Sequence, residues 1–232
     1  MMIFGRLWAV LAMLCTSRWV LLASTTDLYP NPQKDLYRCG QRGRTSWICD
    51  PDQILPFKEA IEVNNTLTDI RQETKCACAN QALCTNGTGP GYRVAVAVMS
   101  FIPTTRSQKI TAKSYATFLR EQEWKYGSCD DDVVIVVSKL EKKVAVSIGD
   151  NAAKMLSADV MKDILSDTNE YFQKENFSDG LLEFIGLMKL AFDNDYKHIP
   201  PFPVWTVVQM AMATLFVLIC FFSMYICRKL YS

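Results

Sequence analysis

The sequence predicts an α/β domain, a mixed β-sheet with helices on both faces, followed by one transmembrane helix. Three observations lead to this prediction. A valine-rich strand, a helix and an apolar strand follow one another, which implies a parallel pair with a right-handed crossover. A charged turn then leads to a further strand, which implies a hairpin. Finally, the uncharged run 202–227 is long enough to cross a bilayer.

The spacing of apolar residues places the elements of the domain. Helices are predicted over 54–71 and 108–124, and two more begin at the capping residues Ser157 and Ser178. The last helix is apolar nearly all round, so it should be wedged deep or face a partner. The predicted strands are residues 92–99, 133–138 and 144–149.

The composition of the strands predicts how they are covered. Alanine alternates with valine in 92–99, which suggests that a helix packs closely there. Every position of 133–138 except its terminal serine is apolar, which is typical of a strand buried on both faces. The first helix carries one apolar stripe, formed by Ala60, Val63, Leu67 and Ile70.

The two ends of the chain hold most of the excess apolarity, in a sequence that is 50% hydrophobic with a net charge of +1. Such a charge gives no reason to expect nucleic acid as a partner. At the start, Arg6 precedes two short apolar runs, which together read as a secretory signal cleaved after Ser17 or near Ser24. The alternative is an uncleaved anchor, but each run is too short to span a bilayer.

The apolar run near the other end predicts a single-pass protein of the cell membrane. Arg228 and Lys229 follow the run, and basic flanks favour the cytoplasm, so the bulk of the chain should lie outside. Within the run, Gln209 could bond a partner helix or reach the lipid headgroups. The expected segments are a signal peptide at 1–24, a disulfide-bearing segment at 25–53, an extracellular domain at 54–195, a stalk at 196–203, the transmembrane helix at 204–227 and a cytoplasmic tail at 228–232.

Six of the nine cysteines fall in the expected extracellular part, and an even number there predicts three disulfides. One is Cys39–Cys49. The other four cysteines allow two arrangements, because a Cys76–Cys78 bond would be strained. These are Cys76–Cys84 with Cys78–Cys129, or Cys78–Cys84 with Cys76–Cys129. Zinc fits poorly, because structural zinc sites use longer Cys-x2-4-Cys spacings.

Three Asn-x-Ser/Thr sequons predict glycosylation in the extracellular part, at Asn64, Asn86 and Asn176. Asn64 falls off the apolar stripe of the first helix, so a glycan there should point to solvent.

The candidate chemistry rests on carboxylates. Asp130, Asp131 and Asp132 precede one strand, and Asp150 follows its antiparallel neighbour, so the hairpin should bring all four together. They could hold calcium, perform acid–base catalysis as in a phosphatase, or only end the strands. The single histidine, His198, lies in the stalk, which excludes a histidine-based triad in the domain. We therefore expect no enzyme, and calcium as the only cofactor to consider.

The order of several motifs resembles the TPM domain family over roughly residues 54–192. The carriers are "WKYG" at 124–127, acidic residues before "VVIVVS", "KKVAVSIGD" at 142–150, "ML" at 155–156 and "YFQKENFSDGLL" at 171–182. One departure concerns Asp131 and Asp132, which occupy a region where family members often have Asn-Gly. Some relatives bind calcium or hydrolyse phosphate esters, so the resemblance bears on these aspartates.

The signal, the cysteine-bearing domain and the single C-terminal helix resemble the nematode branch that includes the modulator of levamisole receptor. The resemblance implies an auxiliary subunit that binds and modulates nicotinic acetylcholine receptor subunits. It also implies a location at the synapse or neuromuscular junction, and the postsynaptic membrane is the side to consider first. None of this follows from composition or spacing.

Overall fold

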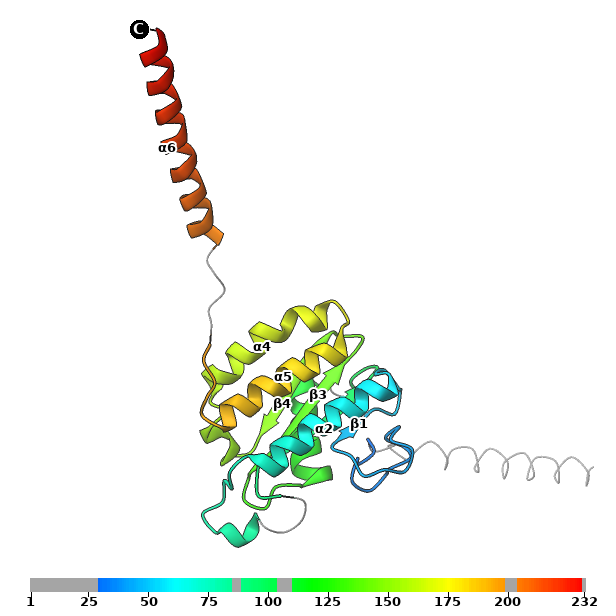
Figure 1. Cartoon of the computed structure of the whole chain (residues 1–232). Coiled ribbons are helices and arrows are strands. Elements are labelled where there is room, and N and C mark those ends of the chain that lie inside the picture. Colours follow the sequence, from blue (N-terminus) through cyan, green and yellow to red (C-terminus); the bar gives the residue numbers. More distant parts are fainter. Residues whose placement is uncertain (1–28, 85–88, 104–109, 199–203, 231–232) are drawn as a thin grey trace, which may run out of the picture. The chain divides into compact units, whose positions relative to one another are not determined.

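A computed structural model describes residues 29–84, 89–103, 110–198 and 204–230 (Figure 1). The predicted signal peptide and Asn86 lie outside these residues. The chain divides into two units, residues 1–196 and 197–232, and each is described by itself. The first unit contains the α/β domain and the second contains one long helix.

The centre of the first unit is a four-stranded sheet in the order β1-β2-β3-β4. Its first three strands are parallel, and β4 is antiparallel to β3. The mixed sheet, the parallel pair and the hairpin are therefore as predicted. The strands are β1 (Ile48–Cys49), β2 (Arg93–Met99), β3 (Asp132–Ser138) and β4 (Lys143–Ile148).

One face of the sheet is covered by three helices, visible in front of it in Figure 1. Helix α5 lies between the other two and contacts both. This position explains its apolar character, because it meets the sheet below and a helix on each side. The helices are α2 (Phe57–Glu73), α4 (Ala158–Gln173) and α5 (Phe177–Phe192).

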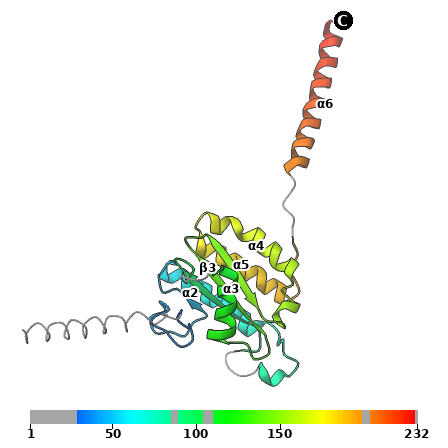
Figure 2. The same cartoon turned by 180° about the vertical axis from the view of Figure 1, so that it is seen from behind.

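The opposite face is covered by α3 (Ala112–Phe118), which continues as a π-helix, η2 (Leu119–Trp124) (Figure 2). Ala95 and Ala97 of β2 point to this side and form one core cluster with Leu119. Helix α3 itself packs mainly against β3 and β4, and the helix that packs on β2 is α2, on the opposite face with the valines. The alanines therefore do not mark the closest helix packing. Helix α3 begins at Ala112 because Thr111 and Ser114 form a reciprocal capping box.

The N-terminal segment, residues 29–53, packs on the same sheet and belongs to the same domain. Strand β1 extends the sheet at its edge, which the sequence analysis did not predict because the strand has only two residues. The hydroxyl of Tyr29 lies 2.6 Å from the carbonyl oxygen of Val98 and 2.8 Å from that of Cys49. The hydroxyl of Tyr126 donates to Asn31 Oδ1 over 2.6 Å. These long-range contacts fix the segment on the α3 side of the sheet.

The two predicted serine caps have different outcomes. Ser157 does cap α4, because its Oγ accepts a hydrogen bond from the backbone N–H of Val160. Ser178 does not cap α5, since the helix begins at Phe177 with Asn176 as the N-cap residue. Ser178 instead donates from its hydroxyl to Glu59 of α2, which joins the two helices.

The second unit contains α6 (Val204–Leu230). Within it, Val208–Ile226 is long and apolar enough to cross a membrane. The side chains described in this stretch are exposed, as expected for a helix whose surroundings would be lipid or another helix.

Candidate functional site

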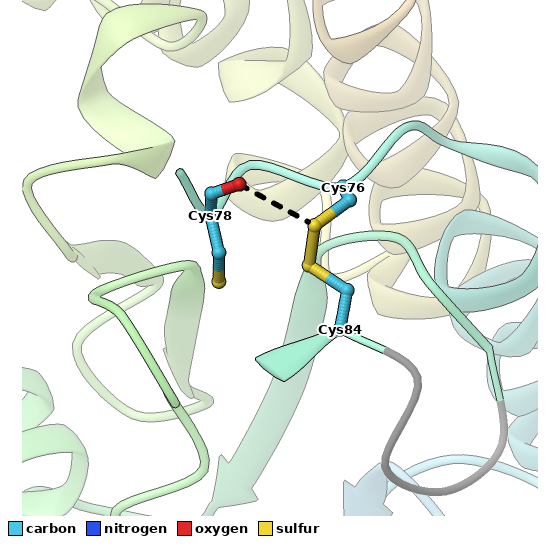
Figure 3. A group of neighbouring side chains, drawn as sticks. All are labelled: Cys76, Cys78 and Cys84. Carbon is cyan, nitrogen blue, oxygen red and sulfur yellow. Dashed lines mark hydrogen bonds between the residues drawn. A yellow bond between two sulfur atoms is a disulfide. The ribbon is translucent and has the colours of Figure 1, made fainter. Parts of the chain in front are cut away.

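Two of the three disulfides lie at the end of the sheet where β2 and β3 begin, and Cys39–Cys49 lies nearer the other end, beside Ala97 of β2. The structure pairs Cys39 with Cys49, Cys76 with Cys84, and Cys78 with Cys129. This is the first of the two arrangements that the sequence allowed. Figure 3 shows the bonded pair with Cys78 beside it, and the Sγ of Cys76 lies 3.7 Å from the Cys78 carbonyl oxygen. The loop that carries Cys76, Cys78 and Cys84 is called here the cysteine-rich loop. The Cys78–Cys129 disulfide joins it to the turn before β3.

These bonds also decide the question of a thiolate metal site. Among the described residues, two groups place three potential ligand atoms within 4.8 Å of one another, and both are built mainly from cysteines. Every cysteine in them belongs to a disulfide. A metal-binding cysteine must be a free thiolate, so the disulfide-bonded form cannot ligate zinc in this way.

The central aspartate of the triplet forms a buried ion pair. Asp131 pairs with Arg93, and the two side chains are 1% and 7% exposed. The other oxygen of Asp131 accepts hydrogen bonds from the backbone N–H groups of Ser128, at 2.8 Å, and Cys129, at 3.3 Å. Asp131 therefore stabilises the turn that carries Cys129 of the third disulfide, and both of its oxygens have partners within the protein.

A second buried arginine supports the cysteine-rich loop. Arg71 of α2 donates to the carbonyl oxygens of Gly91 and Cys84. Burial, together with the charge of Arg93, lowers the pKa of Arg71 to about 10, and Asp131 opposes this shift. The side chain stays protonated at neutral pH, so the two arginines and one carboxylate leave a net positive charge under the loop.

The remaining aspartates line a hollow of about 380 Å³, called here the acidic hollow. It is built by the π-helix η2, the turn before β3 and the turn after β4. Asp150 lies in it with Asp130 and Asp132, so the hairpin does bring these three together. The seven residues that line it are Arg120, Glu121, Lys125, Gly127, Asp130, Asp132 and Asp150.

Two cations line the acidic hollow, and Arg120 is the one that contacts the aspartates. Its Nη1 lies 3.3 Å from Asp132 Oδ1 and 3.8 Å from Asp130 Oδ1. Its Nε donates to the Oγ of Ser147 on β4 over 3.0 Å, which fixes the guanidinium in place. Burial raises the pKa of Asp132, and Arg120 opposes that rise. No sequence motif pointed to Arg120, whose role depends on the π-helix and on β4.

This geometry limits what the acidic hollow can do. Calcium takes six to eight oxygen ligands, and the carboxylates that line the hollow are those of Glu121, Asp130, Asp132 and Asp150. The guanidinium of Arg120 already occupies oxygens of Asp130 and Asp132. A calcium ion would have to compete with a fixed positive charge, and Asp131 is turned away toward Arg93.

The two predicted glycosylation sites that the structure describes differ in their surroundings. Asn64 is half-buried, and its Oδ1 accepts from the backbone N–H of Trp47, at 2.8 Å, and from the hydroxyl of Ser46, at 3.0 Å. Its Oδ1 thus faces the N-terminal segment, and the direction of a glycan on Nδ2 stays a prediction. Asn176 is exposed at the start of α5, and its Nδ2 donates to Asp179.

Comparison with solved structures supports the fold. The chain is similar to the N-terminal domain of a protein from P. gingivalis, with a TM-score of 0.51 and 17% identity over 74% of this chain and 96% of that one. It is also similar to the BA42 protein from Bizionia argentinensis, with a TM-score of 0.47 and 13% identity over 65% of this chain and 90% of that one. The first likeness is consistent with the TPM-like arrangement expected from the motifs. At this identity it concerns the fold alone.

Comparison with known sequences gives the family. A search of curated proteins found no match. The profile of the family described as modulator of levamisole receptor-1 matches residues 24–142, just over half of the chain. The match covers all three disulfides and the strands β1 to β3. The chain therefore belongs to the modulator of levamisole receptor-1 family.

Proposed function

We propose that this chain is a single-pass membrane auxiliary protein that binds and modulates a nicotinic acetylcholine receptor. The observation that carries the proposal is the family match over residues 24–142, because the family is named for modulation of the levamisole receptor. The partner would be one or more subunits of such a receptor at a synapse or neuromuscular junction.

The arrangement of the chain supports this role. Helix α6 could cross the membrane once, and Arg228 and Lys229 follow the apolar stretch and favour the cytoplasmic side. The disulfide-bonded domain would then lie outside, where disulfides persist. An extracellular domain tethered beside a channel can contact its extracellular part, while α6 can pack against its membrane helices.

We propose further that the role is not enzymatic. A carboxylate-based phosphatase would need Asp132 free to react, yet Asp132 is buried and paired with Arg120. Asp131 is held by Arg93 and by two backbone N–H groups. The carboxylates then stabilise the turns at this end of the sheet, and the receptor would be recognised by other surfaces.

Co-purification tests the proposal. Tagged full-length chain expressed with nicotinic receptor subunits should retain the receptor after solubilisation in mild detergent. A single-pass glycoprotein of unrelated sequence, expressed at the same level, should retain none. Absence of receptor from the tagged fraction, across the receptor types tested, would reject the proposal.

A further inference from the structure

A cavity of about 210 Å³ lies where the N-terminal segment meets the start of α2, away from the acidic hollow. Its walls combine aromatic and aliphatic side chains with polar groups. The residues on which the argument depends are Tyr37, Gln41, Arg42, Asp50, Leu55 and Phe57. The volume is below the roughly 300–1,000 Å³ of sites for drug-sized ligands, so the cavity suits a small group.

Two polar side chains of this cavity make no polar contact with other side chains that the structure describes. Gln41 is only 4% exposed, yet its carboxamide has no hydrogen-bond partner among the residues that the structure describes. Its polar atoms are not among the fully enclosed ones, so the amide is open to a group that enters the cavity. The neighbouring Arg42 is exposed at the mouth of the cavity and has no ion-pair partner in the described parts of the chain.

The placement of Arg42 leaves its donors free. The guanidinium carbon lies 4.1 Å from the centre of the Phe57 ring, so the flat face of the group is used in a cation–π contact. The N–H groups of a guanidinium lie in its plane and point outward from its edge. Stacking therefore fixes the group while its edge remains available, which is the arrangement that binds a carboxylate through two parallel hydrogen bonds.

A third polar side chain of the cavity, Asp50, already has its partners. Asp50 is buried, and its two oxygens accept from the backbone N–H groups of Ile54, at 3.0 Å, and Leu55, at 2.7 Å. Its negative charge disfavours a second anion nearby, so a ligand carboxylate belongs at the Arg42 end. The neutral part of the ligand would lie against Leu55 and Phe57.

The loop that carries the cavity is held in shape before any ligand arrives. The Cys39–Cys49 disulfide closes it. Gly40 has a φ of +74°, and a Cβ there would lie 2.7 Å from the carbonyl oxygen of Asp50, so only glycine fits. Arg42 itself has a φ of +52°, in the left-handed region that side chains rarely adopt. A preformed loop spares a ligand the cost of ordering it.

We propose that this cavity binds a carboxylate group, held by the edge of the Arg42 guanidinium and by the carboxamide of Gln41. The carboxylate could belong to a small free acid or to an acidic side chain of a partner polypeptide. The proposal is independent of the receptor role and stands or fails on binding to this chain alone.

Ligand-observed NMR on the full chain in lipid nanodiscs tests the proposal. Sodium propionate serves as the probe, because it matches the end of a glutamate side chain, and propionamide is its uncharged counterpart. Saturation transfer is expected to propionate and not to propionamide. Arg42→Gln should weaken propionate binding about tenfold or more, whereas Arg44→Gln, an exposed arginine of the same loop, should leave it unchanged. A tenfold loss corresponds to about 1.4 kcal/mol.

A second variant covers the possibility that Arg42→Gln disturbs the loop. Gln41→Glu supplies a carboxylate from within the cavity, so it should abolish propionate binding while Arg42 stays in place. Equal binding of propionate and propionamide, no binding of propionate to the wild type, or full binding to either cavity variant would overturn the proposal.

The two sources of the carboxylate are separated by a peptide. Acetyl-Gly-Glu-Gly-amide carries one side-chain carboxylate and no terminal one. If the peptide competes with propionate and binds more tightly, the carboxylate comes from a polypeptide. If propionate binds more tightly than the peptide, the cavity serves small free acids. Both results support the carboxylate site.

Discussion

At the scale of the residue, the four aspartates that the sequence analysis grouped together have separate tasks. Asp131 is a buried ion-pair partner of Arg93, whereas Asp130, Asp132 and Asp150 line a hollow around Arg120. The predicted hairpin does bring three of the carboxylates together. The two arginines were not predicted, because Arg93 meets Asp131 through the register of β2 against β3, and Arg120 is placed by a π-helix that has no distinct sequence signal.

The Arg93–Asp131 pair should be important for stability. Arg93→Gln leaves the Asp131 carboxylate buried without a cation, and breaking a buried pair in this way costs about 3–5 kcal/mol. Lys189→Gln is a matched control, because Lys189 pairs with Glu73 near the surface, where such pairs contribute about 0–1 kcal/mol. Urea unfolding of the domain ending at Tyr196 measures both. Similar losses in the two variants would contradict the assignment.

Asp132 should make the stability of the domain depend on pH. Burial raises its folded-state pKa above the ordinary value of 3.8, although Arg120 opposes the rise. The folded state therefore holds this proton more tightly than the unfolded state, and ionisation above the folded pKa costs stability. That cost disappears as pH falls through the folded pKa to the ordinary value.

Asp132→Asn removes the ionisation. The free energy of unfolding of the variant should therefore rise relative to that of the wild type as pH rises from about 4 to 7. Urea unfolding of both proteins at the two pH values measures the difference. The opposite trend would mean that the pairing with Arg120 outweighs burial and lowers the pKa of Asp132.

At the scale of the element, the alternation and length of apolar runs predicted most of the structure. β2 and β3 lie within one residue of their expected bounds, whereas the helix on the alanine face packs mainly on β3 and β4. Two elements were not predicted from the sequence. β1 has two residues and acquires strand character only by pairing with β2, and η2 follows α3 without any change of composition.

The apolar stretch Val208–Ile226 of α6 carries one strongly polar residue, Gln209, near its N-terminal end. A carboxamide within the hydrocarbon gains from a hydrogen bond to a neighbouring helix, by about 0.6 kcal/mol on average and up to about 2 kcal/mol. If α6 packs against the receptor through this residue, Gln209→Leu should reduce the amount of receptor that co-purifies. Thr214→Val is a suitable control, because the Thr214 hydroxyl already donates to the carbonyl oxygen of Ala211 within the helix.

An unchanged yield with Gln209→Leu would favour the other possibility. The side chain would then reach the lipid headgroups, and the contact with the receptor would depend on the extracellular domain.

At the scale of the whole molecule, the chain combines a disulfide-bonded α/β domain with one helix that could cross a membrane. The order of motifs predicted the family, because the motifs sit at fixed places in the fold: the end of η2, the start of β3, and the turns around β4 and α5. The cavity beside Arg42 was not predicted, since it depends on left-handed residues and a loop packed on α2. Such contacts between distant segments leave no pattern in a sequence.

Agonist-evoked current is the most direct test of the proposed role. Oocytes expressing nicotinic receptor subunits alone are compared with oocytes that also express this chain, at matched receptor levels on the surface. An auxiliary subunit should change the amplitude or the agonist sensitivity of the current. Identical dose–response curves and amplitudes, with the chain present at the surface, would contradict the account.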